Sequence, residues 1–468
     1  MDERDVLERT AAYAAEYLAT LEARPVRAQA SVDELRAALG GPLPERPSEA
    51  LEVVEALVAA AEPGLVAIPA GRYFGFVIGG ALPAALAADW LTSTWDQNAG
   101  LYAGGPSASV VEEVAARWLT ELLGLPAGVS TAFVTGCQLA HVTALAAARH
   151  GVLERAGWDV GRDGLAGSPP LRVVVGEERH VTVDRALRLL GIGASQLVPV
   201  PVDRQGRMEA DGLPALLASS QAPTIVCAQV GNVNTGSVDP LPAIADAAEA
   251  AGAWLHVDGA FGMWAAASPS LRHLVEGIER ADSWATDAHK WLNVPYDSGL
   301  VFCAHPEAHR AAMTVHASYL VQAEPGGERD QVDWTPEFSR RARGFPVYAA
   351  VRALGRSGIA ELVERCHAHA RRFAESLGDE PGVEILNDVV LNQVLVRFAG
   401  ADEATREVVS RVQEDGTCWL SGTTWRGVAA MRISVSNWRT TDADVDRSVA
   451  AILRVAAGVA PRAPAHSL

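Results

Sequence analysis

The stretch DSWATDAHKWLNVPYDSG, residues 282–299, places a lone lysine, Lys290, between an apolar run and a turn-rich one. Lysine side chains usually lie on solvated surfaces, where the stem packs and the ammonium group stays in water. A lysine at the end of an apolar run is therefore either snorkelling to the surface or taking part in chemistry. The segment HVDGA, residues 256–260, favours chemistry, because it puts Asp258 in the same kind of position.

Short apolar runs alternate with helical stretches from about residue 105 onward. This alternation predicts parallel βαβ units and an α/β fold with a doubly wound, mainly parallel sheet. Ligands of such sheets bind beyond the carboxyl ends of the strands, where Asp258 and Lys290 fall. The expected strands are residues 131–136, 171–178, 223–231, 253–260, 281–288 and 298–305.

The 468 residues are too many for one ordinary core, and we predict three parts. Residues 1–72 form an N-terminal helical segment, residues 73–345 a large domain, and residues 346–468 a smaller α+β domain. The first part carries an apolar helical stripe made of Leu7, Ala11, Ala14, Leu18 and Leu21. That stripe needs a partner surface, either the main body or a second subunit.

The composition argues against several classes of partner. A net charge of −18 disfavours binding to nucleic acid or to an anionic membrane. Five cysteines without any C-x-x-C spacing argue against a zinc site or a disulfide framework, and we expect no metal. The start lacks the apolar region of a signal peptide, and the longest uncharged stretch is too short to span a membrane, so we expect a cytoplasmic protein.

Four segments are expected to bring reactive groups to one edge of the sheet. Asp258 ends one strand, Lys290 follows the next, and His180 in EERH ends a third. Gly136 in VTGCQLAH forms a turn between strand and helix, where backbone N–H groups can hold an anion.

Pyridoxal phosphate would satisfy all of these groups at once. A buried aspartate needs a cationic partner, whereas a lysine that forms an imine gives up its charge. The cofactor's aldehyde would condense with Lys290, its protonated ring nitrogen would pair with Asp258, and its phosphate would lie on the Gly136 turn. His180 would stack on the open ring face, and the ring would serve as an electron sink.

These segments resemble the group II pyridoxal-phosphate-dependent amino acid decarboxylases of fold type I, which include aromatic amino acid and glutamate decarboxylases. The resemblance extends from RYFGFVIGG, residues 72–80, to MRISVSNW, residues 431–438. It implies a Schiff-base role for Lys290, a ring-nitrogen role for Asp258, and a stacking role for His180. It also implies a homodimer, with the N-terminal helix packing across it and the active site at the subunit interface.

The sequence departs from the family pattern beside the expected phosphate. Cys137 and Gln138 stand where the family usually offers glycine and serine, so backbone N–H groups carry more of the binding. Asp287 replaces a common asparagine, and its charge would repel a phosphate, so it is left out of the cofactor-binding set. That set also takes in His289, Ala260 and, from GNVNTGSVDP (residues 231–240), Thr235.

The resemblance also assigns residues to the reaction. Arg432 is the candidate grip for a substrate carboxylate, although strand arginines often make structural ion pairs instead. Tyr319, in ASYLVQAEPGGERDQ (residues 317–331), matches a catalytic loop whose tyrosine protonates the substrate carbon. Such an acid contributes roughly 10²–10⁴-fold. Phenylalanine replaces this tyrosine in related aldehyde synthases, so Tyr319 favours the amine product.

The segment DWLTSTWDQNAG, residues 89–100, is similar to the family's substrate wall. Gln97 and Asn98 would contact a polar group of the substrate, with structural hydrogen bonds as the alternative. Tyr73 and Phe74 favour a large or aromatic substrate, with packing in the core as the alternative. Three functions stay open: an amino acid decarboxylase, an aldehyde synthase or aminotransferase on the same fold, and a non-catalytic homologue.

Overall fold

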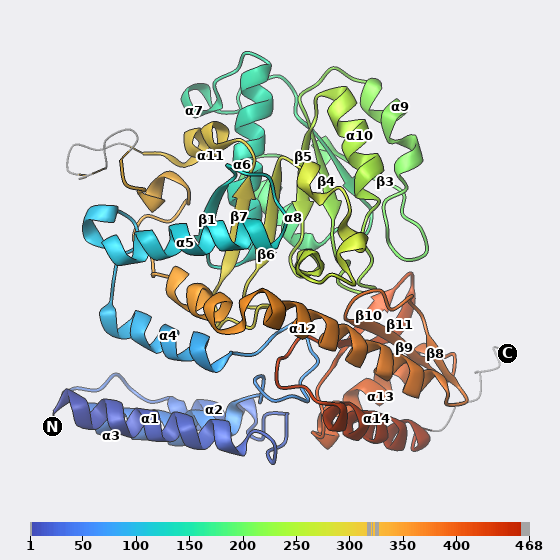
Figure 1. Ribbon diagram of the computed structural model, residues 1–468. Coiled ribbons are helices and arrows are strands. Elements are labelled where there is room, and N and C mark those ends of the chain that lie inside the picture. The colour runs from blue at the N-terminus through green and yellow to red at the C-terminus, as the bar shows by residue number, and fades with distance from the viewer. Residues whose placement is uncertain (1, 316–319, 321, 323–326, 460–468) are drawn as a thin grey trace.

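A seven-stranded sheet forms the centre of the computed structural model, which describes residues 2–315, 320, 322 and 327–459 (Figure 1). The strand order is β1-β7-β6-β5-β4-β2-β3. The predicted α/β class is therefore confirmed. The strands are β1 (Ser130–Val134), β2 (Arg172–Gly176), β3 (Leu197–Val200), β4 (Thr224–Gln229), β5 (Trp254–Asp258), β6 (Ser283–Asp287) and β7 (Gly299–Cys303).

Strand directions bring the carboxyl ends of β1, β2, β5 and β6 to the same edge. Strands β2 to β6 pair in parallel, and β7 runs antiparallel to both β6 and β1. Strand β7 reverses because only a loop, residues 288–298, connects it to β6, and a parallel return needs a longer crossover. Segments following these four strands can therefore form one site.

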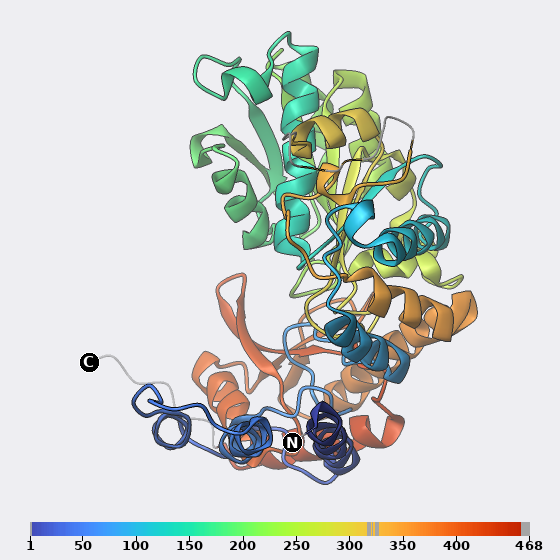
Figure 2. The ribbon, with the colours of Figure 1, turned by 90° about the vertical axis from the view of Figure 1, so that its left-hand side faces the viewer.

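Helices cover both faces of this sheet (Figures 1 and 2). Helix α6 packs on β1, β4, β5, β6 and β7, and its alanine-rich face allows this close approach. The helices of this region are α5 (Pro106–Leu122), α6 (Cys137–Arg155), α7 (Val160–Asp163), α8 (Val181–Leu189), α9 (Leu213–Ala218), α10 (Leu241–Ala251) and α11 (Pro306–Met313).

A second, antiparallel sheet lies below the first and is covered by two helices (Figure 1). Its order is β10-β11-β9-β8. Its elements are β8 (Val383–Ile385), β9 (Gln393–Phe398), α13 (Asp402–Asp415), β10 (Ser421–Trp425), β11 (Val428–Ser434) and α14 (Asp442–Ala457).

Helix α12 (Gly344–Gly378) connects the two sheets. It contacts α4 (Pro83–Trp95) and α5 beside the large sheet, and β8 and β9 of the small one. Gly355 interrupts it with a φ of 61°, a left-handed conformation that favours glycine. The domain boundary predicted at residue 345 falls in the first turn of this helix and stays a prediction.

The N-terminal helices α1 (Glu3–Thr20), α2 (Val32–Leu39) and α3 (Ala50–Ala61) pack on one another beside the small sheet (Figure 2). Leu21, at the end of the predicted apolar stripe, is buried against Ala67 and Ala70, whereas Leu7 at its start is 59% exposed. Part of the stripe is thus uncovered. Among the described residues, no helix is long and apolar enough to cross a membrane.

Short 3-10 helices complete the described elements: η1 (Glu62–Gly64), η2 (Tyr102–Gly104), η3 (Ala194–Gln196), η4 (Ala210–Gly212), η5 (Gly262–Ala267), η6 (Arg272–Val275), η7 (Ile278–Arg280) and η8 (Gln331–Asp333).

Buried neutral histidines make the fold sensitive to acid. His309 in α11 is 2.8 Å from Ser130 Oγ and 2.9 Å from the Trp334 carbonyl oxygen, and burial lowers its pKa to about 3. A histidine in the unfolded chain has a pKa near 6.5, so below that pH it binds a proton, whereas His309 in the native chain stays unprotonated. The contribution of His309 to stability is complete above pH 6.5 and decreases by about 1.4 kcal/mol per pH unit below it.

We expect the stability advantage of the wild type over a His309→Gln variant to shrink as the pH falls from 7 to 5. Urea unfolding of both proteins at three pH values measures this difference. A constant difference over that range would contradict the assignment of His309 as a buried neutral group.

Candidate active site

Lys290 lies in the loop after β6, at the edge where the four strands end. Its side chain is 20% exposed, and its Nζ is 3.1 Å from Asp287 Oδ2. Burial works to lower the pKa of Lys290, but Asp287, Cys137 and Asp258 raise it above the usual value. The amine is therefore a largely buried cation among acidic groups, and the snorkelling alternative does not hold.

Asp287 occupies the centre of the site, although sequence reasoning set it aside. Its Oδ1 accepts a 2.6 Å hydrogen bond from the backbone N–H of Cys137 and lies 3.5 Å from His289 Nε2. The N-terminus of α6 favours an anion through its free N–H groups and its dipole. The helix end predicted to hold a phosphate thus binds a carboxylate that also contacts Lys290.

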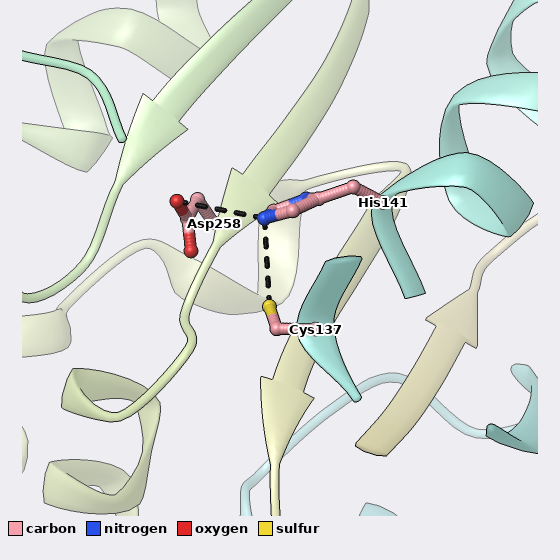
Figure 3. Close-up of side chains that lie close together, drawn as sticks. All are labelled: Cys137, His141 and Asp258. Atoms are coloured by element: carbon pink, nitrogen blue, oxygen red, sulfur yellow. Dashed lines mark hydrogen bonds and ion pairs between the residues drawn. The ribbon is translucent and has the colours of Figure 1, made fainter. Parts of the chain in front are cut away.

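Asp258 ends β5 and is buried beside a histidine of α6 (Figure 3). Its Oδ2 lies 3.6 Å from His141 Nε2, and its Oδ1 accepts the N–H of Ala260. Burial alone would raise the pKa of Asp258, but His141, His180 and Lys290 together hold it well below its usual value. The carboxylate is consequently ionised at neutral pH.

Cys137, His141 and Asp258 offer ligand atoms within 4.8 Å of one another, an arrangement that a metal ion could also use (Figure 3). The Cys137 sulfur is 3.4 Å from His141 Nε2. Burial, with Asp287 and Asp258 nearby, raises the pKa of the Cys137 thiol well above its usual value. Metals bind the thiolate, so a metal here would have to displace the thiol proton.

His180 caps the N-terminus of α8. Its Nδ1 lies 2.7 Å from Thr182 Oγ1, and the Thr182 carbonyl accepts a hydrogen bond from the Gln138 side chain. This contact ties the start of α8 to the start of α6. Burial lowers the pKa of His180, and Asp258, Lys290 and Arg432 also influence it electrostatically, so the ring is neutral among the site residues.

Two glycines keep space around the lysine. A Cβ at Gly136, the residue before α6, would lie 3.2 Å from His289 Cε1 and 3.5 Å from Asp287 Oδ1. A Cβ at Gly79 would collide with the Lys290 carbonyl oxygen. Beside these two glycines lie an amine, a buried carboxylate and a helix N-terminus. These groups suit the aldehyde, the ring nitrogen and the phosphate of one cofactor, respectively.

Arg432 projects from β11 and is 9% exposed. Its Nη1 makes one long contact, 3.4 Å, with the Val233 carbonyl oxygen, and among the described residues its Nε has no hydrogen-bond partner. Burial lowers its pKa. This guanidinium is largely desolvated and makes few hydrogen bonds within the described residues. It therefore suits an anionic ligand, and the structural ion pair considered from sequence is the poorer explanation.

The prediction that Phe74 faces the substrate is wrong. Phe74 is 1% exposed and packs edge-on against Phe373 in the core, with ring centroids 4.9 Å apart. Two consecutive left-handed residues, Phe76 and Val77, turn the chain so that Phe76 becomes 55% exposed. Phe76 lies 5.3 Å from the Trp419 ring, on which Tyr73 stacks.

Tyr296 is a further exposed aromatic residue that sequence reasoning missed. Its ring stacks on that of His289, with centroids 4.2 Å apart, so it lies beside the lysine loop. The exposed ring of Phe76 could have been inferred only from the backbone turn, whereas Tyr296 stands six residues after Lys290 in the opening stretch.

Gln97 and Asn98 make backbone contacts in this structure. The Gln97 amide donates to the Trp95 carbonyl, and Asn98 Oδ1 accepts the N–H groups of Gly100 and Arg340. These are the structural hydrogen bonds that the sequence left open as an alternative.

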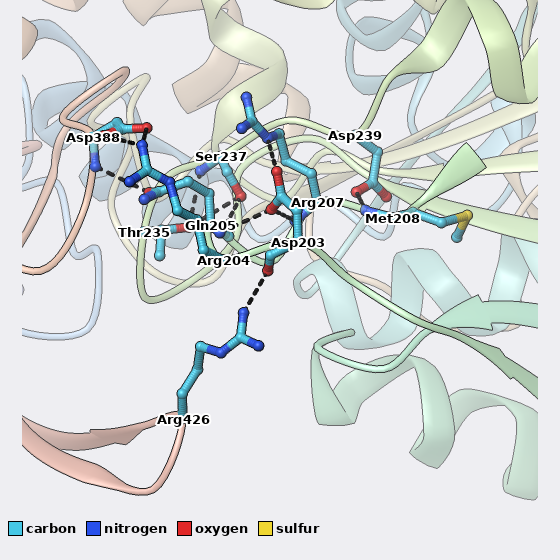
Figure 4. Close-up of polar contacts among 10 residues, drawn as sticks. All are labelled: Asp203, Arg204, Gln205, Arg207, Met208, Thr235, Ser237, Asp239, Asp388 and Arg426. Atoms are coloured by element: carbon cyan, nitrogen blue, oxygen red, sulfur yellow. Dashed lines mark hydrogen bonds and ion pairs between the residues drawn. The ribbon is translucent and has the colours of Figure 1, made fainter. Parts of the chain in front are cut away.

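Thr235 belongs to a polar network that joins the large sheet to loops of the small sheet (Figure 4). Its hydroxyl donates to the Gln205 carbonyl oxygen and approaches Ser237 Oγ. The Arg426 guanidinium donates to the Asp203 carbonyl at the far side of the same network. The Thr235 hydroxyl proton is thus committed inside the protein, so this residue suits a linking role better than phosphate binding.

Asn293 holds the lysine loop and was also missed. It has a left-handed φ of 56°, which asparagine tolerates better than most residues. Its side-chain amide donates to the Ser436 carbonyl and its Oδ1 accepts the Trp438 N–H, both at 2.9 Å. Its own carbonyl accepts the N–H of Leu82. Three distant segments therefore meet at this residue.

Tyr319 lies outside the described residues, so its assignment to the catalytic loop stays a prediction.

The profile of the family described as Pyridoxal-dependent decarboxylase conserved domain matches residues 34–399. The chain belongs to this family of amino acid decarboxylases, and its cofactor is pyridoxal 5′-phosphate. The crystal structure of Oryza sativa TDC with PLP and tryptamine has the same fold. It superimposes with a TM-score of 0.90 at 24% identity and covers 97% of each chain.

Two curated relatives are similar along most of the chain. Tryptophan decarboxylase 1 of Oryza sativa subsp. japonica is 28% identical and covers 93% of this chain and 90% of its own length. The 4-hydroxyphenylacetaldehyde synthase of Rhodiola rosea is 26% identical, and the match covers 92% of this chain and 90% of the synthase. One name states the amino acid that is decarboxylated and the other states an aldehyde product. Similarity to these relatives therefore establishes the family and the cofactor of this chain but not its substrate.

Proposed function

We propose that this protein removes the α-carboxylate of an L-amino acid with a large or aromatic side chain, giving the amine and CO2. The observation that carries the proposal is the placement of Lys290 and Asp258. Lys290 follows β6, Asp258 ends the adjacent buried strand β5, and both lie at the N-terminus of α6. An amine, an ionised carboxylate and an anion-binding helix end stand together there.

Each group has a distinct part in holding pyridoxal phosphate. Lys290 would bind the aldehyde carbon, Asp258 would face the ring nitrogen, and His180 would cover a ring face. Backbone N–H groups of Gly136 and Gln138, together with His289, would receive the phosphate, while the Cys137 N–H stays bound to Asp287. When bound, the cofactor supplies an electron sink for the charge that develops as CO2 leaves.

The remaining site residues act on the substrate. Arg432 offers a planar pair of donors to a carboxylate, which orients the bond to be broken. Phe76, Trp419 and Tyr296 provide aromatic surface near the lysine loop, which supports a large or aromatic side chain.

We also propose a homodimer. Helix α4 exposes Trp90, Leu91 and Trp95, and the N-terminal helices expose Leu7 and Leu57. Large apolar side chains gathered on such surfaces suit a second subunit better than water. The apolar stripe predicted from sequence would then be covered across the interface.

A product screen tests the reaction. Purified holoprotein is incubated with a pool of L-amino acids, and the products are identified by mass spectrometry beside a Lys290→Ala control. An amine that is absent from the control supports the decarboxylase and names its substrate. Aldehyde or keto acid would instead favour the synthase or aminotransferase, and no product would favour the non-catalytic homologue.

A Tyr319→Phe variant is expected to shift the product from amine toward aldehyde. The phenol is the proposed proton donor to the substrate carbon, and its loss slows that protonation. Chromatographic quantification of amine and aldehyde from the same reaction measures the ratio. An unchanged amine yield in this variant would remove Tyr319 from the mechanism.

A further inference from the structure

A line of buried polar contacts extends from Asp258 into the protein interior. His141 Nε2 is 3.6 Å from Asp258 Oδ2, and His141 Nδ1 is 3.0 Å from His256 Nε2. His256 Nδ1 is in turn 3.0 Å from Ser283 Oγ, which accepts the indole N–H of Trp254 at 2.9 Å. Both histidines and the serine are fully buried. We call these five residues the Asp258 relay.

The local sequence explains why these side chains meet. His256 and Asp258 are two residues apart in β5, so they point to the same face of the sheet. Helix α6 packs on that face and presents His141 one turn after Cys137. The titratable groups near the inner end of Asp258 are therefore Cys137, His141 and His256, with His180 and Lys290 acting from the site.

One arrangement of protons fits the groups at both ends of the relay. The Trp254 indole can only donate, so Ser283 Oγ accepts from it and has its own proton free for His256 Nδ1. His256 is neutral, because burial lowers its pKa to about 3. With Nδ1 accepting from Ser283, the single ring proton lies on Nε2. His256 donates that proton to His141 Nδ1.

His141 is then left with an N–H on Nε2, directed at Asp258. An ionised carboxylate can only accept, so the opposite end of the relay demands the same direction. The 3.6 Å separation is longer than an ordinary N–H···O hydrogen bond, so the contact with Asp258 is electrostatic. In this buried environment such a dipole is only weakly screened.

We propose that His141 and His256 are positioning residues that keep Asp258 ionised and oriented toward the ring nitrogen of pyridoxal phosphate. The inference rests on the proposed role of Asp258 in binding that nitrogen. His256 acts without touching Asp258. If its N–H is lost, His141 can move its proton to Nδ1 and turn an unprotonated nitrogen toward the carboxylate.

Paired variants of His256 separate this role from simple packing. His256→Leu removes the donor to His141, whereas the amide of His256→Gln retains an N–H at the corresponding position. Losing a hydrogen bond in a chain that ends on a charged group corresponds to roughly 10- to 100-fold in affinity. We expect the Kd of the apoprotein for pyridoxal phosphate to rise by that factor in His256→Leu and to stay near the wild-type value in His256→Gln.

The absorption of the bound cofactor gives a second readout. A ring nitrogen that is less well held by Asp258 is less protonated, and the loss of that positive charge favours protonation of the nitrogen attached to Lys290. The pH midpoint of the visible band should therefore move to higher pH in His256→Leu. Ser283→Ala, a smaller change further along the relay, should move both readouts in the same direction.

His309→Leu is the matched control, because His309 is equally buried and makes two hydrogen bonds outside the relay. It should leave the cofactor Kd and the midpoint unchanged. The relay is refuted if His256→Leu and Ser283→Ala bind the cofactor as the wild type does. It is equally refuted if His256→Gln or His309→Leu loses as much affinity as His256→Leu.

An Asp258→Asn variant distinguishes failure of the relay from failure of the proposed site. If Asp258→Asn binds the cofactor with wild-type affinity, the role given to Asp258 is wrong and the relay falls with it. If Asp258→Asn loses affinity while His256→Leu does not, the site stands and only the relay is wrong.

Discussion

A Lys290→Ala variant is expected to lose decarboxylase activity by more than about 10⁴-fold. Lys290 provides the covalent attachment of the cofactor and an amine close to the reacting carbon, and proton transfer alone contributes roughly 10²–10⁴-fold. The rate of amine release, measured on the substrate that the product screen identifies, gives the size of the loss.

The composition of the chain allows the site of cofactor attachment to be identified without ambiguity. Lys290 is the only lysine in the sequence, and every other residue among the 39 lysines and arginines is an arginine. Borohydride reduction of the holoprotein should therefore attach the cofactor to one peptide, which mass spectrometry can identify. Cofactor found on any other peptide would contradict the assignment.

Lys290→Arg is the control for charge. It retains a cation beside Asp287, but a guanidinium does not condense with an aldehyde near neutral pH. It should be as inactive as the alanine variant while preserving more of the apoprotein's thermal stability. Appreciable activity in Lys290→Arg would mean that charge, rather than the covalent bond, is what the site requires.

An Asp258→Asn variant is expected to weaken binding of pyridoxal phosphate by roughly 10²–10⁴-fold. Asparagine keeps the shape of the side chain but leaves a buried ring cation without its counter-charge, which costs about 3–5 kcal/mol. Titration of the apoprotein with the cofactor, followed by fluorescence, gives the Kd directly.

Asp282→Asn serves as the matched control for this second prediction. Asp282 precedes β6 at the opposite edge of the sheet, where it accepts the Leu255 N–H and pairs with His305. Its substitution should lower the melting temperature without changing the cofactor Kd. A similar loss of affinity in both variants would show that Asp258→Asn acts through general destabilisation.

Most of the large sheet could be predicted from sequence, because its central strands are continuous apolar runs between helices. Strand β3 was missed because its LVPV sequence is short, only partly buried and contains a proline, which suits the sheet edge it occupies. The reversed direction of β7 was also missed, since direction depends on the connecting segment rather than on the strand's own residues.

The sequence could place residues of the candidate site where a residue ends or closely follows a strand, as Lys290, Asp258 and His180 do. The site was not predictable where function depends on a contact between segments. His141 looked like one more residue of an alanine-rich helix until α6 was placed over His256. Phe74 and Phe76 are alternating aromatics in the sequence, and only the left-handed turn at Phe76 and Val77 decides which of them is exposed.

The hydrogen bonds of Asn293 join the lysine loop to a segment that is synthesised much later. The lysine loop is fastened by hydrogen bonds to Ser436 and Trp438, which are translated more than 140 residues after it. A nascent chain that has not yet emerged as far as Trp438 lacks both fastenings, even though Lys290, Asp258 and His180 have already been made. We therefore expect fragments that stop short of residue 438 to hold the lysine loop, and with it the cofactor, less firmly than the full chain does.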